Sequence, residues 1–163
     1  MVAQPFNRDE ILEWLAEVPD PEIPVVTIMD LGIVRDVEIH RGVVVSLSPT
    51  YSGCPATEVI EQSVIAALED RGIADVSIKR VLSPPWTTDW ISDAGREKLL
   101  KIGIAPPQQG GGKRALVHGQ REIACPRCDS TNTKIVSEFG STACKASYRC
   151  SDCLEPFEYF KCI

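Results

Sequence analysis

The chain has 163 residues, of which 44% are hydrophobic and 25% charged, as in soluble globular proteins. This length suits one ordinary domain plus a small second module. The formal net charge of −6 argues against non-specific binding to nucleic acid or anionic membranes, which requires basic patches. The N-terminus does not resemble a signal peptide and no apolar run approaches membrane-spanning length, so we expect a cytoplasmic protein without a membrane partner.

The first predicted elements follow in the order helix, strand, strand, helix, strand. This order indicates a small α+β sandwich with helices over a short mixed sheet. Asn7 is a suitable cap for the first helix, with Glu10 as the reciprocal half of a capping box. Gly42, which can take a positive φ, stands in the hairpin before the second strand, which is apolar on both faces and is expected to be central. The expected helices cover 8–18, 55–71 and 93–102, and the expected strands cover 33–39, 43–48 and 76–81.

A proline-rich loop with two carboxylates follows the first helix. It reads Val18-Pro19-Asp20-Pro21-Glu22-Ile23-Pro24. Its three prolines exclude both a helix and a central strand, which leaves an extended, rigid loop. From the residues alone, Asp20 and Glu22 are interpreted as solvated turn residues.

A cysteine stands where an apolar strand meets a helix, in the segment Thr50-Tyr51-Ser52-Gly53-Cys54-Pro55-Ala56-Thr57. Unpaired N–H groups and the dipole at a helix N-terminus stabilise a thiolate. This placement therefore predicts that Cys54 has a lowered pKa and is reactive or binds a metal. The alternative is a small buried hydrophobic residue, which is the role of most free cysteines.

Two tryptophans stand close together in the loop Ser83-Pro84-Pro85-Trp86-Thr87-Thr88-Asp89-Trp90. They form either a lid over the core or an exposed surface for a partner. Trp86 and Trp90 are therefore candidate partner-binding residues.

The segment Pro106-Pro107-Gln108-Gln109-Gly110-Gly111-Gly112-Lys113 has the composition of a linker, with nothing to bury. The expected organisation is an α+β domain over 1–105, a flexible linker over 106–119 and a C-terminal module over 120–163.

Six of the seven cysteines lie beyond residue 124, and four of them form two C-x-x-C units. Two such knuckles turn four thiolates onto one tetrahedral cation, and the residues around them alternate as strands do. This spacing predicts a zinc ribbon, although a mononuclear iron site of the same shape is chemically open. Because four thiolates leave no open position for a substrate, we expect a structural metal. The predicted ligands are Cys125, Cys128, Cys150 and Cys153.

Two further cysteines of this module, Cys144 and Cys162, lie outside the C-x-x-C units. They either fill the thin core of the ribbon or act as additional ligands for a second metal or an iron–sulfur cluster.

Several motifs together resemble the metal–sulfur cluster assembly family, which includes the bacterial SufT domain. They are Asp20-Pro21-Glu22-Ile23-Pro24, Asp30-Leu31-Gly32 and Thr50-Tyr51-Ser52-Gly53-Cys54-Pro55. The double-tryptophan loop, Gly103-Ile104-Ala105-Pro106-Pro107 and the cysteine module resemble a branch of this family from aerobic phenylacetate degradation, whose members carry a zinc ribbon. The resemblance covers about Asn7 to Cys162.

The resemblance implies an α+β assembly domain with a pocket beside the cysteine. The family's pocket residues match Asp20, Glu22, Thr50 and Cys54, and hard carboxylates beside a soft thiolate suit transient handling of iron or a cluster. The implied role is maturation of iron–sulfur proteins. The implied partners are subunits of the phenylacetyl-CoA epoxidase, first its reductase with a [2Fe–2S] centre and second its oxygenase with a diiron site.

Two functions are weighed for the chain. The first is a non-enzymatic assembly factor. The two histidines, His40 on a hairpin and His118 in the linker, are not paired with a cysteine for nucleophilic catalysis, and there is no phosphate-binding loop or dinucleotide fingerprint. The second is a structural or regulatory oxygenase subunit in which Cys54 only packs. Redox catalysis by C-x-x-C is disfavoured because both pairs fit one closed site, and a homodimer is left open.

Overall fold

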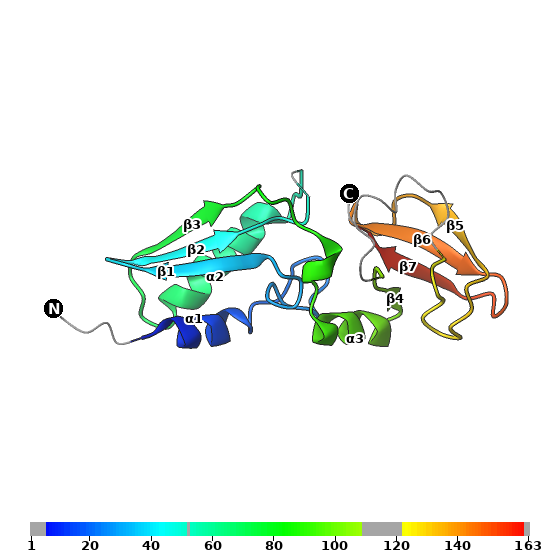
Figure 1. Cartoon of the computed structure of the whole chain (residues 1–163), viewed down its shortest axis with the longest axis horizontal. Coiled ribbons are helices and arrows are strands. Elements are labelled where there is room, and N and C mark those ends of the chain that lie inside the picture. Colours follow the sequence, from blue (N-terminus) through cyan, green and yellow to red (C-terminus); the bar gives the residue numbers. More distant parts are fainter. Residues whose placement is uncertain (1–5, 52, 109–121, 162–163) are drawn as a thin grey trace. The chain divides into compact units, whose positions relative to one another are not determined.

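The computed structural model describes residues 6–51, 53–108 and 122–161. They fall into two compact units, Met1–Trp86 and Thr87–Ile163, which are treated separately below (Figure 1). The units thus divide before the third helix, whereas the sequence predicts a domain boundary after residue 105. Among the described residues, none of the helices combines the length and hydropathy that a membrane crossing requires.

The first unit is an α+β sandwich with a three-stranded sheet. Strand β2 is central, as its two-sided apolar sequence predicts. It is antiparallel to β1 and parallel to β3 (Figure 1). Helix α2 provides the crossover from β2 to β3, and α1 packs against α2 and β1. The elements are α1 (Arg8–Leu15), β1 (Val34–Ile39), β2 (Val43–Leu47), α2 (Thr57–Glu69) and β3 (Val76–Arg80).

The capping box of α1 is confirmed. The Asn7 side chain accepts from the N–H groups of Asp9 and Glu10, and the Glu10 carboxylate accepts from the Asn7 N–H at 2.8 Å. The helix ends at Leu15 instead of the predicted residue 18. A proline disfavours helical geometry at the residue before it, so the chain leaves the helix before Pro19.

The proline-rich loop is held by the side chain of Asp20. Its Oδ1 accepts from the N–H groups of Glu22 at 2.9 Å and Ile23 at 2.8 Å, and the Asp20 N–H donates to the Val26 carbonyl. Asp20 is 7% exposed, so its interpretation as a solvated residue is wrong. The loop is folded around a buried carboxylate and is not simply extended.

Gly42 does not take the positive φ that its place in the hairpin suggested, and close packing is what requires a glycine there. A Cβ at this position would lie 2.5 Å from the Asp75 carbonyl oxygen, against which the hairpin packs. Positive φ values occur at Gly72 and Gly103, which follow α2 and α3 (Asp93–Lys101) and suit the ends of helices.

The first tryptophan of the double-tryptophan loop is a core residue of the first unit. Trp86 is 5% exposed, and its indole N–H donates to the Leu31 carbonyl at 2.8 Å. The burial of Trp86 agrees with the lid interpretation and not with an exposed surface, and the partner-binding role of Trp86 and Trp90 stays a prediction. Trp90 is half-buried in the second unit.

The second unit contains a four-stranded sheet in the order β4-β7-β6-β5. The strands β5, β6 and β7 form the antiparallel ribbon that the sequence predicts, and its core includes Phe157 and Tyr159. The two-residue strand β4 was not predicted; it adds parallel to β7, with Ile104 opposite Glu158. The elements after α3 are β4 (Ile104–Ala105), β5 (Thr133–Ser137), β6 (Lys145–Cys150) and β7 (Pro156–Phe160), and the 3-10 turn η1 (Thr88–Trp90) precedes α3.

We predict that Gly42→Ala destabilises the first unit by about 1–3 kcal/mol, because the new methyl group meets backbone that cannot rotate away. Urea unfolding would measure the loss. His40→Ala, at the exposed tip of the same hairpin, is the control and should change the free energy of unfolding by less than about 0.5 kcal/mol. Equal values for the two variants would contradict the packing role of Gly42.

Candidate functional site

Cys54 lies in a tight turn between β2 and α2. Its N–H donates to the Tyr51 carbonyl at 3.3 Å, and its own carbonyl accepts from the Thr57 N–H at 3.2 Å. Helix α2 begins at Thr57, three residues after the cysteine, and not at Pro55 as predicted. The half-buried thiol opens into a pocket of about 310 Å³. The pocket is lined by Pro49, Cys54, Pro55, Thr57, Glu58, Arg80 and Leu82.

Burial raises the pKa of the Cys54 thiol, so the predicted lowering of this pKa is wrong. The Ala56 N–H and the Thr57 hydroxyl favour the thiolate, but desolvation outweighs them, and the carboxylates of Glu22 and Asp20 raise the pKa further. The dipole of helix α2 does not lower this pKa below its ordinary value, because the first turn of the helix starts at Thr57, beyond the cysteine. The sulfur is therefore protonated at neutral pH.

The structure brings both acidic residues of the proline-rich loop within electrostatic range of Cys54. Asp20 already uses one oxygen to hold the loop, whereas Glu22 is half-buried. Thr50 is half-buried in the same turn segment as Cys54, but it is not among the described residues that line the pocket. The four-residue site predicted from the family resemblance stays a prediction.

Two features of this site were not predicted. Thr57 acts on Cys54 through both its N–H and its hydroxyl; its position three residues after the cysteine was the available signal. Arg80, at the end of β3, lines the pocket and forms a two-pronged ion pair with Glu61 of α2, whose Nη2–Oε2 distance is 2.9 Å. Only the fold brings β3 and α2 together, so no local pattern could have revealed this pair.

The four cysteines of the C-x-x-C units converge in the second unit. Their sulfur atoms lie within 4.8 Å of one another, with 3.7 Å between Cys125 and Cys153 and 3.6 Å between Cys128 and Cys150. A tetrahedron with metal–sulfur bonds of about 2.3 Å has edges of about 3.8 Å. The sulfur positions therefore fit one tetrahedral metal ion.

Backbone N–H groups of the knuckles point at these sulfur atoms. The N–H of Cys153 is the main cause that lowers the pKa of Cys150 to about 7, with Asp152 adding a second N–H. Ser130 and Glu155 donate in the same way to Cys128 and Cys153, but the neighbouring cysteine thiols and burial raise the pKa of both residues, that of Cys128 to about 12. The backbone N–H groups thus favour the thiolate form that a metal requires, whereas the crowding of the sulfur atoms opposes it.

The remaining described cysteine of this unit is a core residue. Cys144 is 5% exposed, its sulfur lies 3.1 Å from the Thr142 hydroxyl, and it is not a member of the four-cysteine cluster. The core-filling interpretation therefore holds for Cys144. Cys162 and most of the predicted linker, including His118, lie outside the described residues.

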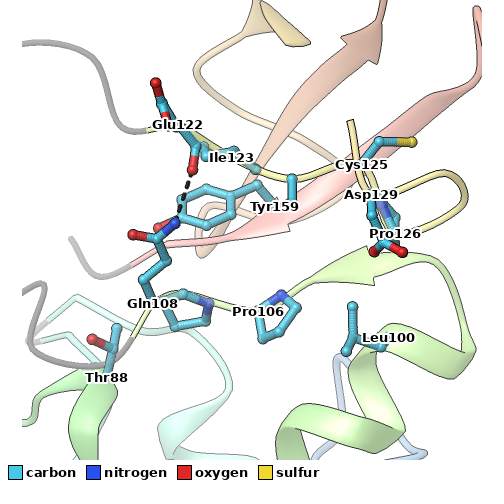
Figure 2. Close-up of a pocket in the computed structure, with 12 residues that line it drawn as sticks. Thr88, Leu100, Pro106, Gln108, Glu122, Ile123, Cys125, Pro126, Asp129 and Tyr159 are labelled. Atoms are coloured by element: carbon cyan, nitrogen blue, oxygen red, sulfur yellow. Dashed lines mark hydrogen bonds between the residues drawn. The ribbon is translucent and has the colours of Figure 1, made fainter. Parts of the chain in front are cut away.

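A second hollow lies within the second unit, beside the first knuckle (Figure 2). It measures about 270 Å³ and is mostly apolar, with Leu100, Pro106, Ile123 and Tyr159 on its walls. Gln108 donates to the Glu122 carbonyl at 3.0 Å, and the sulfur of Cys125 points away from the hollow (Figure 2). This space is therefore separate from the metal-binding sulfur of the first knuckle.

We predict that Glu22→Gln lowers the pKa of the Cys54 thiol, because removing a negative charge favours the thiolate. The rate of alkylation against pH should shift to lower pH. Glu58→Gln is the matched control, since Glu58 lines the same pocket but is not among the groups that shift this pKa. An unchanged or higher pKa in Glu22→Gln would contradict the assigned electrostatics.

We predict that Cys150→Ser abolishes stoichiometric metal binding and unfolds the ribbon, whereas Cys144→Ser retains the metal. Elemental analysis and amide NMR spectra would measure both effects. A strong chelator should likewise collapse ribbon resonances and leave those of residues 6–86 in place. A ribbon indifferent to chelation would contradict a folding role for the metal.

Comparisons with known proteins match segments of both units. Residues 8–79 match the family model described as iron–sulfur cluster assembly protein, and residues 109–161 match the one described as PaaD zinc beta ribbon domain. The chain is 50% identical over 160 residues to a protein of Escherichia coli (strain K12) that is named as a component of the 1,2-phenylacetyl-CoA epoxidase, covering 98% of this chain and 95% of that protein.

Two further relatives cover the assembly domain. The Fe-S protein maturation auxiliary factor YitW of Bacillus subtilis (strain 168) is 33% identical over 100 residues, covering 60% of this chain and 94% of that protein. The crystal structure of a domain of unknown function, DUF59, from Bacillus anthracis superposes with a TM-score of 0.53 at 27% identity, covering 56% of this chain and 90% of that chain. The chain therefore belongs to the iron–sulfur cluster assembly protein family, in the PaaD branch, where a zinc beta ribbon follows the assembly domain.

Proposed function

We propose that this chain is a maturation factor for iron–sulfur proteins that serves the phenylacetyl-CoA epoxidase system and does not itself catalyse epoxidation. One observation carries the proposal: the Cys54 thiol faces an open pocket, and the Glu22 and Asp20 carboxylates act on it. This arrangement lies in the segment that matches the iron–sulfur assembly model. The names of the relatives, an epoxidase component and a maturation auxiliary factor, support the two halves of the proposal.

In this proposal the cargo is iron or an iron–sulfur cluster, and Cys54 is its transient ligand. The raised pKa of the Cys54 thiol means that a proton competes with the metal for the sulfur, which weakens metal binding and favours release. Glu22 and Asp20 place negative charge beside the sulfur and attract a cation. Thr57 orients the sulfur through its hydrogen bond, and Thr50 shapes the turn.

The four-cysteine site has the opposite character and holds zinc permanently. Its four thiolates close the coordination shell, and knuckle N–H groups stabilise them. Zinc binding supplies the free energy that so small a ribbon needs to fold, and the folded ribbon binds the client protein.

The client is the reductase subunit of the epoxidase with its [2Fe–2S] centre. Two findings support this choice: the assembly domain matches an iron–sulfur cluster assembly model, and a relative is named as part of the epoxidase. A [2Fe–2S] centre is the kind of site that cluster delivery would serve. The diiron site of the oxygenase subunit is the second target.

A different function is favoured by one observation: the Escherichia coli relative is named as part of the epoxidase itself. A structural or regulatory subunit would remain in the complex at fixed stoichiometry, and Cys54 would be dispensable. Size-exclusion chromatography of the complex assembled from purified subunits separates the two functions, because a maturation factor dissociates once its client is loaded.

We predict that cells carrying Cys54→Ser produce reductase with a markedly reduced content of iron and sulfide, while the variant itself stays folded. Cys144→Ser is the control, because Cys144 is buried away from both sites and should leave client loading unchanged. Iron and sulfide analysis of purified reductase measures the effect. Fully loaded reductase from Cys54→Ser cells would overturn the maturation function.

A further inference from the structure

The second knuckle contains a leucine in the left-handed region of backbone conformation. Leu154, directly after Cys153, has a φ of 64°. Large side chains rarely adopt this conformation, because Cβ approaches the following carbonyl oxygen; glycine has no such conflict. The side chain is also 60% exposed, so it gains little from burial within its own unit.

The knuckle geometry imposes this backbone conformation. The residue after the second cysteine of the first knuckle, Asp129, has a similar φ of 57°. Aspartate tolerates the left-handed region better than leucine does. Leu154 is held in place because its carbonyl accepts from Arg149 Nε at 3.3 Å, while the next residue, Glu155, accepts from the Cys150 N–H. Hydrogen bonds thus fix the backbone at Leu154, while its side chain is exposed.

An open groove of about 340 Å³ begins at the residue after Leu154. Glu155 and Pro156 line it together with Pro126 of the first knuckle and the end of α3. The α3 end contributes two further exposed apolar side chains that line the groove, Leu100 at 44% and Ile102 at 50% exposure. We call Leu154 and this groove the knuckle face.

The charge around the knuckle face is opposite to that of the whole chain. Lys101 and Arg127 line the groove, and Arg149 contacts Leu154, whereas the groove's carboxylate, Glu155, is paired with Arg127 at 3.0 Å. The chain as a whole carries a formal charge of −6. An apolar anchor with a cationic rim favours a partner surface that has carboxylates around an apolar contact.

We propose that the knuckle face is a docking site for a protein partner, with Leu154 as the anchor that inserts between apolar side chains flanked by carboxylates. The identity of that partner, the epoxidase reductase subunit, rests on the proposed function. Backbone strain at an exposed leucine is then the cost of presenting an anchor where glycine would suit the fold better.

The test compares Leu154→Gly with Asp129→Gly in the metal-loaded full chain. Both changes place glycine at a left-handed position after a knuckle. We expect Leu154→Gly to unfold at a denaturant concentration no lower than wild type, yet to bind purified reductase at least about tenfold more weakly. Asp129→Gly should bind as wild type does, and added salt should weaken wild-type binding.

The outcomes separate this proposal from the proposed function. Unchanged binding by Leu154→Gly, a lower unfolding midpoint, or conversion of a wild-type dimer to monomer in ultracentrifugation would each overturn the docking site. Failure of the wild type to bind the reductase would overturn both proposals. If Leu154→Gly loses binding but Cys54→Ser still loads the reductase fully, the docking site stands and the maturation function falls.

Discussion

The buried carboxylate of Asp20 is the interaction on which the candidate site depends. By accepting two consecutive N–H groups, it folds a loop that prolines deprive of ordinary secondary structure. The fold of that loop brings Glu22 near Cys54, and the Asp20 charge itself reaches the same sulfur. The Asp20 side chain therefore shapes the loop and also adds charge beside the sulfur, which makes its substitution hard to interpret and makes Glu22 the cleaner probe.

The two units place sulfur in different settings. The Cys54 thiol lies at an open pocket, where burial and neighbouring carboxylates raise its pKa, and it is not a member of the four-cysteine cluster. The ribbon sulfurs converge on one point, where backbone N–H groups lower the pKa of Cys150 to about 7. In the proposed function this difference separates a transient ligand from a permanent metal site.

The sequence predicted those features that local chemistry determines. The capping box at Asn7, the central position of β2 and the four-cysteine cluster all follow from residue type and spacing, and all are confirmed. The features that depend on tertiary packing were missed or wrong. The pKa of Cys54 is set by burial, Trp86 is buried by its bond to Leu31, and β4 forms only because β7 offers an edge.

The short strand β4 bears on the interpretation of the glycine-rich stretch after it as a linker between two domains. Pairing of Ile104 and Ala105 with β7 fastens the chain to the ribbon sheet before residue 109, and the chain belongs to that same unit again from Glu122. Both flanks of the stretch are thus tethered to one body. Changing its length should therefore act within the second unit.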